Sequence, residues 1–324
     1  MNATELLAQL QSTDGRETFS ALFGRPYLLL QLASATASEV EQLRAGMVQL
    51  PCPVIALGDI PENAAALVDT VVATEKDAAV LCKNIERHPF TAMTLVQLLR
   101  HNEHATISDG LLAESLAYAT LQGGQEFRAF LANRKASTNP PATSQPAVLC
   151  ERQGDHLAIT LNQPERRNAF SVAMRDDLVA ALQLLGQDCS ISGASIRGAG
   201  ECFCVGGDLD EFGQVADTAS GHAIRSTRNA GRLLAEQSER IQCFVHRACI
   251  GAGIELPAFC HRVIASKDTY FQLPEIALGL VPGAGGSVSV LRRIGRHRSA
   301  WLALSGKRIN ASKALEWGLI DAIE

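Results

Sequence analysis

Two glycine-rich turns that each carry a glutamate constrain the fold of this chain most. The first reads Cys249-Ile-Gly-Ala-Gly-Ile-Glu255, and the second runs from Glu275 to Gly286 with four glycines. Glycine-rich turns at helix starts leave backbone N–H groups free to hold a developing oxyanion. Two carboxylates at one small site can divide the acid and base steps of a proton-transfer reaction. The pattern therefore predicts acid/base chemistry beside a carbonyl group.

The composition narrows the class of protein. The chain has 324 residues, is 47% hydrophobic and carries a net charge of −5, so we expect a substantial core and no nucleic-acid partner. No apolar run reaches the ~18 residues of a membrane span, so we expect no membrane partner. The nine cysteines are scattered, and Cys202 with Cys204 lacks a second pair at zinc-site spacing. We expect buried reduced thiols, no metal and, without a signal-peptide pattern, a cytoplasmic location.

A stretch rich in proline, serine and threonine, from Ala136 to Pro146, divides the chain. We expect an N-terminal segment over residues 1–135, a linker over 136–147 and a second domain over 148–324. In the N-terminal segment, apolar runs predict strands at 27–32, 53–57 and 70–73. Apolar periodicity then predicts helices at about 77–87, 91–100, 108–122 and 126–134.

Strands and helices alternate after the linker, which is typical of an α/β protein. Strands are predicted at 156–161, 194–197, 241–245 and 263–265. Ser171 is a candidate N-cap for a helix through Leu185. A polar helix is predicted at about 221–240, and further helices begin near Gly253 and Ser287.

Residues 148–324 carry a series of motifs that resembles the crotonase, or enoyl-CoA hydratase/isomerase, superfamily. The motifs occur in family order and lie at 161–171, 197–209, 251–256, 273–286 and 304–321. The resemblance implies a crotonase-like ββα superhelix (the ClpP/crotonase fold), with an N-terminal mixed α/β, mainly helical segment. It also implies an acyl-CoA substrate and no cofactor, because CoA is part of the substrate.

The resemblance assigns roles to individual residues. Glu255 is implied as the base that activates water, and Glu275 as the acid that protonates the α-carbon. The backbone N–H groups of Val205 and Ala252 are implied as the oxyanion hole. The implied substrate- and CoA-binding residues are Arg166, Arg167, Gly206, Gly207, Asp208 and Gly251. The two arginines could either contact a phosphate of CoA or lie solvated in their loop, and both interpretations stay open. Asp208 could either order its loop or approach the acyl chain, and these interpretations also stay open.

The glutamate pair favours hydration of a 2-enoyl-CoA. Isomerisation, thioester hydrolysis and C–C cleavage use the same enolate stabilisation and stay open, as does a CoA-binding protein without turnover. Arg247 stands where relatives usually have glycine, so it would narrow the pantetheine tunnel or bind a carboxylated substrate. His246 is interpreted as a hydrogen-bonding residue at a strand end.

The helices before the linker resemble a part of the family found elsewhere in its chains. In relatives, Gly-Leu-Ile-Asp is usually followed by helices that pack against neighbouring subunits, whereas this sequence ends at Glu324. Residues 68–134 resemble that helical cap in order. Either the cap has been relocated to the N-terminus or these helices are unrelated to it. A relocated cap implies a homotrimer or a dimer of trimers.

Overall fold

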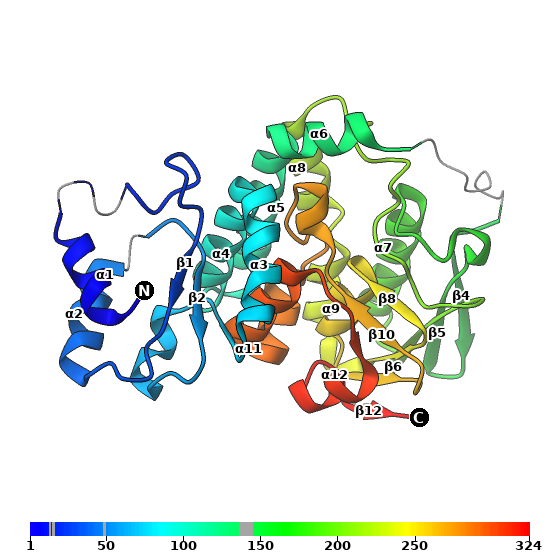
Figure 1. Ribbon diagram of the computed structural model, residues 1–324. Coiled ribbons are helices and arrows are strands. Elements are labelled where there is room, and N and C mark those ends of the chain that lie inside the picture. Colours follow the sequence, from blue (N-terminus) through cyan, green and yellow to red (C-terminus); the bar gives the residue numbers. More distant parts are fainter. Residues whose placement is uncertain (13, 15–16, 48–49, 136–144) are drawn as a thin grey trace.

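The computed structural model describes residues 1–324 except positions 13, 15–16, 48–49 and 136–144. Most of the predicted linker therefore lies outside the described residues. The described strands form three sheets, of three, three and six strands. Figure 1 shows the first of them at one end of the molecule and the other two at the opposite end, with helices between them.

The first region is a small α/β unit at the N-terminus. Its three-stranded parallel sheet has the order β1-β2-β3, and the predicted strands are confirmed with narrower bounds. Asn2 begins the first helix by accepting a hydrogen bond from the Glu5 N–H, while the Glu5 carboxylate accepts from the Asn2 N–H. The elements are α1 (Ala3–Leu10), β1 (Leu28–Leu30), α2 (Ala37–Met47), β2 (Val54–Leu57), the 3₁₀ turn η1 (Glu62–Leu67) and β3 (Thr70–Val72).

Four helices follow and confirm the four predicted between residues 77 and 134. Thr74 and Thr106 cap the first and third by accepting from the N–H groups of Asp77 and Asp109. The helices are α3 (Glu75–Arg87), α4 (Pro89–Asn102), α5 (Ile107–Gln122) and α6 (Gln125–Asn133). Helices α3, α4 and α5 pack against the long helix α11 (Gly286–Ser305) near the other end of the sequence (Figure 1).

The remaining strands form two sheets and confirm the predicted α/β class. The larger sheet is parallel except for its β4–β5 hairpin. In sheet order its strands are β12 (Ala322–Ile323), β9 (Arg262–Ala265), β7 (Ile241–Val245), β6 (Gly193–Gly198), β5 (His156–Leu161) and β4 (Val148–Gln153). The smaller sheet contains β11 (Ile309–Asn310), β10 (Tyr270–Gln272) and β8 (Ala248–Ile250).

The helices of this domain agree with the sequence except in one region. Ser171 caps α7 (Val172–Gln187), as predicted, by accepting from the Met174 N–H. The single polar helix predicted at 221–240 is wrong, because the chain forms α8 (Thr218–Thr227) and α9 (Ala230–Glu236) instead. Asn229 explains the break: its backbone is extended and its side chain caps α9. The other helices are α10 (Ala252–Glu255) and α12 (Ala311–Trp317).

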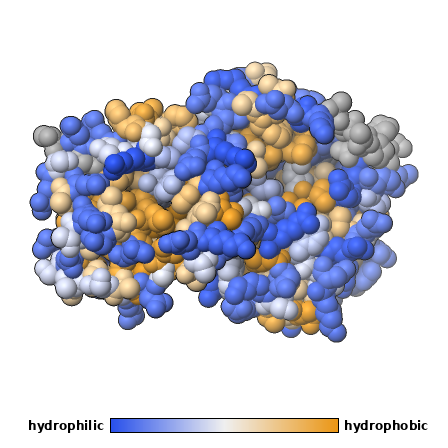
Figure 2. Space-filling model, viewed as in Figure 1, coloured by the Kyte–Doolittle hydropathy of each residue, from blue (hydrophilic) through white to orange (hydrophobic). Residues whose placement is uncertain are grey.

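The buried apolar residues form two separate cores. One lies inside the N-terminal unit and holds residues between Ala3 and Val68. The other joins the faces of α3 to α6 with the interior of the 148–324 domain. Figure 2 shows apolar side chains where the two regions meet, and a groove of about 520 Å³ there is lined by Tyr27 and Leu29, among others. The cysteine prediction is confirmed for seven thiols but wrong for Cys150 and Cys189, which are free and exposed.

Candidate active site

The two glycine-rich turns of the sequence meet at Gly251, between β8 and α10. Gly251 has φ 51° and ψ −122°, a backbone conformation that is disfavoured for any residue with a Cβ atom. The loop holding Gly206 lies directly against it, because a methyl group at Gly206 would be 2.9 Å from the Ile250 carbonyl oxygen. A side chain at Gly206 or at Gly251 would therefore force the Gly206 loop and the Gly251 turn apart.

The carboxylates of Glu255 and Glu275 both face Gly251, as their sequence motifs predicted. A methyl group at Gly251 would lie 2.6 Å from Glu275 Oε1 and 3.7 Å from Glu255 Oε1. Glu255 is the last residue of the single helical turn α10, and Glu275 begins the 3₁₀ turn η5 (Glu275–Leu278). The side chains converge on one small space instead of pointing apart.

Glu255 is buried and held by backbone donors. Its Oε2 accepts from the N–H groups of Ala284 and Gly286 at 2.7 and 2.9 Å. Burial raises the pKa of this carboxyl to about 7, although the hydrogen bonds oppose the rise by favouring the charged form. A carboxyl with a pKa near 7 can act as a base at neutral pH.

Glu275 has an unusual environment for a carboxyl. Its Oε2 is buried and has no hydrogen-bond partner among the described residues. Burial first, and then the charge of Glu255, hold the pKa of Glu275 well above its usual range. Both causes favour the protonated form of Glu275, which suits it to act as an acid beside Glu255.

A third buried carboxylate, Glu114, reaches this region from helix α5 and was missed in the sequence. Its oxygens accept from the N–H groups of Gly285 and Ser287 at 2.7 and 2.9 Å, and from Ser287 Oγ at 2.6 Å. Burial and the charge of Glu255 raise its pKa to about 8. One signal was available: Glu114 follows Leu111 by three positions, which places a charged residue on the predicted apolar face.

The two predicted oxyanion donors differ in their present hydrogen bonds. Ala252 is the first residue of α10, so its N–H has no partner within the helix. The N–H of Val205 donates to the Arg167 carbonyl oxygen at 3.3 Å, which is a long bond. The two segments run together, because the Ile250 N–H donates to the Cys204 carbonyl at 3.1 Å.

The predicted CoA-binding loop is ordered by its own charges. Arg166 donates to the carboxylates of Asp208 and Asp210 at 2.6 and 2.9 Å. Asp208 is buried in this contact, which supports the interpretation that it orders its loop. Gly207 lies against Phe212, since a methyl group there would be 2.9 Å from the ring. The side chain of Arg167 is exposed.

Arg247 lies away from the carboxylates. Its side chain is 62% exposed and forms an ion pair with Asp268 at 3.8 Å. Its φ of 51° belongs to the left-handed region, which explains why glycine suits this position. His246 Nε2 lies 3.0 Å from the Gly200 carbonyl oxygen after strand β7, as its interpretation required.

Two cavities border the carboxylate site. An apolar cavity of about 20 Å³ lies behind Ala252 and is lined by side chains such as Leu161 and Leu256. It has room for about one water molecule. An open pocket of about 160 Å³ is lined by Gly283, Phe170, and Tyr118 from the N-terminal helix α5. The larger opening therefore lies between the two halves of the chain.

Helix α8 closes one side of this open pocket by binding to α5. Arg225 on α8 donates to Ser115 Oγ at 3.1 Å and to Gln122 Oε1 at 3.2 Å. Its guanidinium carbon lies 4.6 Å from the centre of the Tyr118 ring, a cation–π contact. His222 Nδ1 also lies 2.9 Å from Ser115 Oγ.

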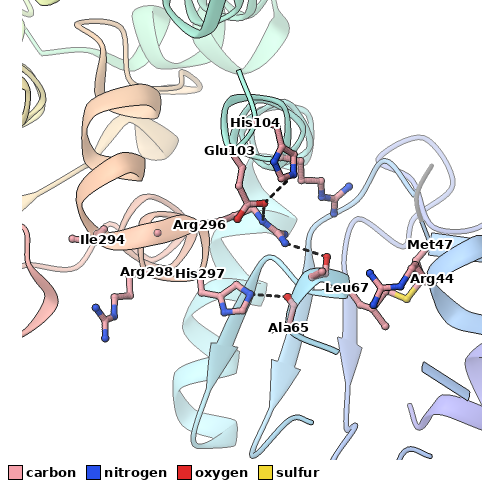
Figure 3. Close-up of a pocket in the computed structure, with 13 residues that line it drawn as sticks. Arg44, Met47, Ala65, Leu67, Glu103, His104, Ile294, Arg296, His297 and Arg298 are labelled. Atoms are coloured by element: carbon pink, nitrogen blue, oxygen red, sulfur yellow. Dashed lines mark hydrogen bonds and ion pairs between the residues drawn. The ribbon is translucent and has the colours of Figure 1, made fainter. Parts of the chain in front are cut away.

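A cavity of about 700 Å³ lies elsewhere, where the N-terminal unit joins α4 and α11. Figure 3 shows Arg296 and His297 pointing from α11 toward this unit, with His297 Nε2 2.9 Å from the Ala65 carbonyl oxygen. Arg296 also pairs with Asp69 at 3.1 Å and with Glu103 at 2.8 Å. These two side chains join the two regions, and neither catalytic candidate lines the cavity.

Two negative findings concern only the described part of the chain. No helix there is long and apolar enough to cross a membrane. No group of three or more histidine, cysteine, aspartate or glutamate side chains there is arranged to hold a metal ion.

Comparison with known sequences identifies relatives of the 148–324 domain. The family model described as enoyl-CoA hydratase/isomerase matches residues 151–324. The 2,3-dehydroadipyl-CoA hydratase of Escherichia coli is 36% identical over 54% of this chain and 68% of its own length. A mevalonyl-coenzyme A hydratase of Aspergillus fumigatus is 33% identical over 52% of this chain and 62% of its own. The 1,2-epoxyphenylacetyl-CoA isomerase of Escherichia coli is 35% identical over 51% and 64%.

Solved structures give the same result for the fold. The enoyl-CoA hydratase of Thermoplasma volcanium superposes with a TM-score of 0.52 and 30% identity, over 56% of this chain and 72% of that one. An enoyl-CoA hydratase/isomerase of Marinobacter aquaeolei gives a TM-score of 0.51 and 31% identity, over 55% and 70%. Residues 1–150 lie outside the family match.

Proposed function

The chain belongs to the enoyl-CoA hydratase/isomerase family, and from this premise we propose that it adds water across the double bond of a 2-enoyl-CoA thioester. The observation that carries the proposal is the convergence of Glu255 and Glu275 on Gly251. Their raised pKa values have different consequences, one giving a base near neutrality and the other a protonated acid. Hydration needs both on one face of the alkene.

In the proposed reaction, Glu255 removes a proton from water while the water oxygen attacks the β-carbon. The electron pair of the double bond moves toward the thioester, and negative charge develops on its carbonyl oxygen. The N–H groups of Ala252 and Val205 would stabilise that oxygen, and the loss of one such donor typically costs about 3–4 kcal/mol. The Val205 N–H would give up its long hydrogen bond to the Arg167 carbonyl oxygen and donate to the thioester oxygen instead.

Glu275 then transfers its proton to the α-carbon, which gives a 3-hydroxyacyl-CoA. Addition is syn, because both carboxyl groups lie on the Gly251 side of the site. The reaction regenerates the enzyme once the proton gained by Glu255 has passed to Glu275, directly or through solvent. No cofactor is required, because CoA is part of the substrate, and the exposed Arg167 is the proposed contact for its phosphates.

The N-terminal helices are included in the proposal as a relocated cap. Support comes from the packing of α3, α4 and α5 on α11 and from Tyr118 in the open pocket. Leu112 and Leu116 of α5 are 51% and 50% exposed, one turn apart on the outer surface. We propose that they pack against another copy in a homotrimer or a dimer of trimers, which sedimentation would test.

Isomerisation of the double bond is the second candidate function. One relative, 35% identical, is named as an isomerase, and two carboxyl groups facing one site can also move a proton between carbons. Hydrolysis and C–C cleavage use the same enolate stabilisation. A binding protein without turnover is less favoured, because the Arg247 side chain is 62% exposed and pairs with Asp268.

The test uses crotonyl-CoA and the loss of its conjugated-thioester absorbance. Wild-type protein should consume that absorbance and yield 3-hydroxybutyryl-CoA, identified by chromatography. Glu275→Gln should lose at least about 100-fold in kcat, because proton transfer by one positioned group typically contributes 10²–10⁴-fold. Inactive wild-type protein across a panel of enoyl-CoAs would defeat the proposal, and a product with a shifted double bond would identify an isomerase.

A further inference from the structure

The turn at the start of α11 is held from two sides by carboxylates from different halves of the chain. Four consecutive backbone N–H groups, from Ala284 to Ser287, alternate between them. Glu255 accepts from residues 284 and 286, and Glu114 accepts from residues 285 and 287. The bond lengths lie between 2.7 and 2.9 Å for both carboxylates.

This arrangement follows from the chemistry of a helix start. The first N–H groups of a helix have no partner within it, and they carry partial positive charge. A carboxylate on one side can satisfy only the alternate groups that point toward it, so the others require a second acceptor. Glu114 supplies that acceptor and also takes the Ser287 hydroxyl at 2.6 Å. Without it, two buried N–H groups would be unsatisfied, and the turn would rotate to find water or another partner.

We propose that Glu114 is a positioning residue that fixes the carboxylate of Glu255 through the 284–287 turn. The N-terminal helix α5 would then belong to the catalytic apparatus of the 148–324 domain. This inference rests on the proposed function, in which Glu255 is the base. Charged or titratable groups that interact with the pair include Glu275, Tyr118, Arg225 and Cys204.

Glu114 also affects the pKa of Glu255 through this turn. The N–H groups of Ala284 and Gly286 donate to Glu255 and favour its charged form, against the effect of burial. If the loss of Glu114 displaces the turn, these donors are withdrawn and the pKa of Glu255 rises. A residue that only supported the fold elsewhere would not produce this rise.

The chain offers a closely matched control in Glu126. Its carboxylate likewise accepts from two backbone N–H groups and one hydroxyl, those of Phe90 and Thr91, at the start of α4. Glu126→Gln therefore removes an equivalent helix-start carboxylate from the same N-terminal helices. It does not touch the 284–287 turn.

The experiment compares full-length Glu114→Gln and Glu126→Gln with crotonyl-CoA as substrate. We expect Glu114→Gln to lower kcat about 10- to 100-fold, the cost of a misplaced catalytic group, with KM within about threefold of wild type. The acid limb of its kcat/KM profile should move to higher pH, because a displaced turn withdraws the N–H donors that favour ionised Glu255. Glu126→Gln should change neither. Glu114→Asp keeps the carboxylate but shortens its reach, so it should lower kcat and move the acid limb in the same direction.

A second measurement separates this inference from the proposed function. The full chain is labelled with ¹³C at glutamate carboxyl carbons, and the Glu255 signal is identified by its absence in Glu255→Gln. Its titration midpoint should rise in Glu114→Gln and stay unchanged in Glu126→Gln, whether or not the wild type turns over a substrate. If the wild type is inactive but Glu114→Gln shows this shift, only the hydratase proposal is defeated and the positioning role stands. A Glu114→Gln protein that matches Glu126→Gln in kcat, acid limb and titration would overturn the positioning role.

Discussion

The two parts of the N-terminal segment relate to the rest of the molecule in opposite ways. Residues 1–72 fold largely around their own core, while Ile55 and Val72 of the small sheet and buried ion pairs centred on Asp69 join this unit to the rest of the chain. Helices α3 to α6 share a core with the 148–324 domain and contribute Glu114 and Tyr118 to its site. The proline-rich stretch marks a division in the sequence, yet the division between cores lies near residue 70.

The difference shows that apolar faces, and not sequence order, decide which domain an element belongs to. The buried face of α3, with Leu81 and Ile85, joins the core of a domain that begins more than sixty residues later. In contrast, Val40 and Leu43 of α2 face the small sheet of their own unit. Substitutions in the two parts should therefore have different consequences.

The largest effect is expected at the ionic joint between the two regions. Asp69 accepts from Arg100 at 2.5 and 2.8 Å, from Arg296 at 3.1 Å and from the Val54 N–H at 2.8 Å. Asp69→Asn leaves two largely buried arginines without their shared counter-charge, which typically costs about 3–5 kcal/mol. Urea unfolding of the full chain would measure it. A loss below about 1 kcal/mol would show that the joint contributes little.

Paired core truncations test whether the two cores unfold separately. Leu95→Ala in α4 and Leu43→Ala in α2 each remove a buried leucine, and each should cost about 2–5 kcal/mol. Leu95→Ala should weaken the transition that also abolishes acyl-CoA binding. Leu43→Ala should shift a transition that leaves that binding intact. A single unfolding transition, shifted equally by both variants, would show that the two cores unfold cooperatively and would contradict their separation.

The sequence predicted the convergence of Glu255 and Glu275 because their motifs are local and each motif fixes a turn. It could not predict Glu114, whose bond to Gly285 joins residues 171 positions apart. Periodicity describes which face of a helix is apolar, but it does not say which surface that face will meet. The break at Asn229 was missed for a different reason, because the polar stretch around it has no periodic pattern to interrupt.

The pH dependence of stability should come from the shared core. Burial raises the pKa of Glu255 to about 7 and of Glu114 to about 8, so the folded chain keeps protons that the unfolded chain loses near pH 4.5. Stability therefore falls as pH rises through this window, because the folded state binds more protons. We expect Glu114→Gln to remove about 1–3 kcal/mol of that fall between pH 5 and 8. Urea midpoints with the same pH slope in both proteins would contradict it.

The smallest effect is expected where α8 binds to α5. Arg225→Met removes the bonds to Ser115 and Gln122 and should cost about 1 kcal/mol, the usual net value of such contacts. Because α8 closes one side of the open pocket, KM for a 2-enoyl-CoA should rise more than kcat falls. Arg232→Met on α9 is the control, since Arg232 forms an exposed pair with Glu236 at 3.9 Å. Equal KM values for the two variants would mean that α5 and α8 do not act together on the substrate, and that the catalytic share of the N-terminal helices rests on Glu114 alone.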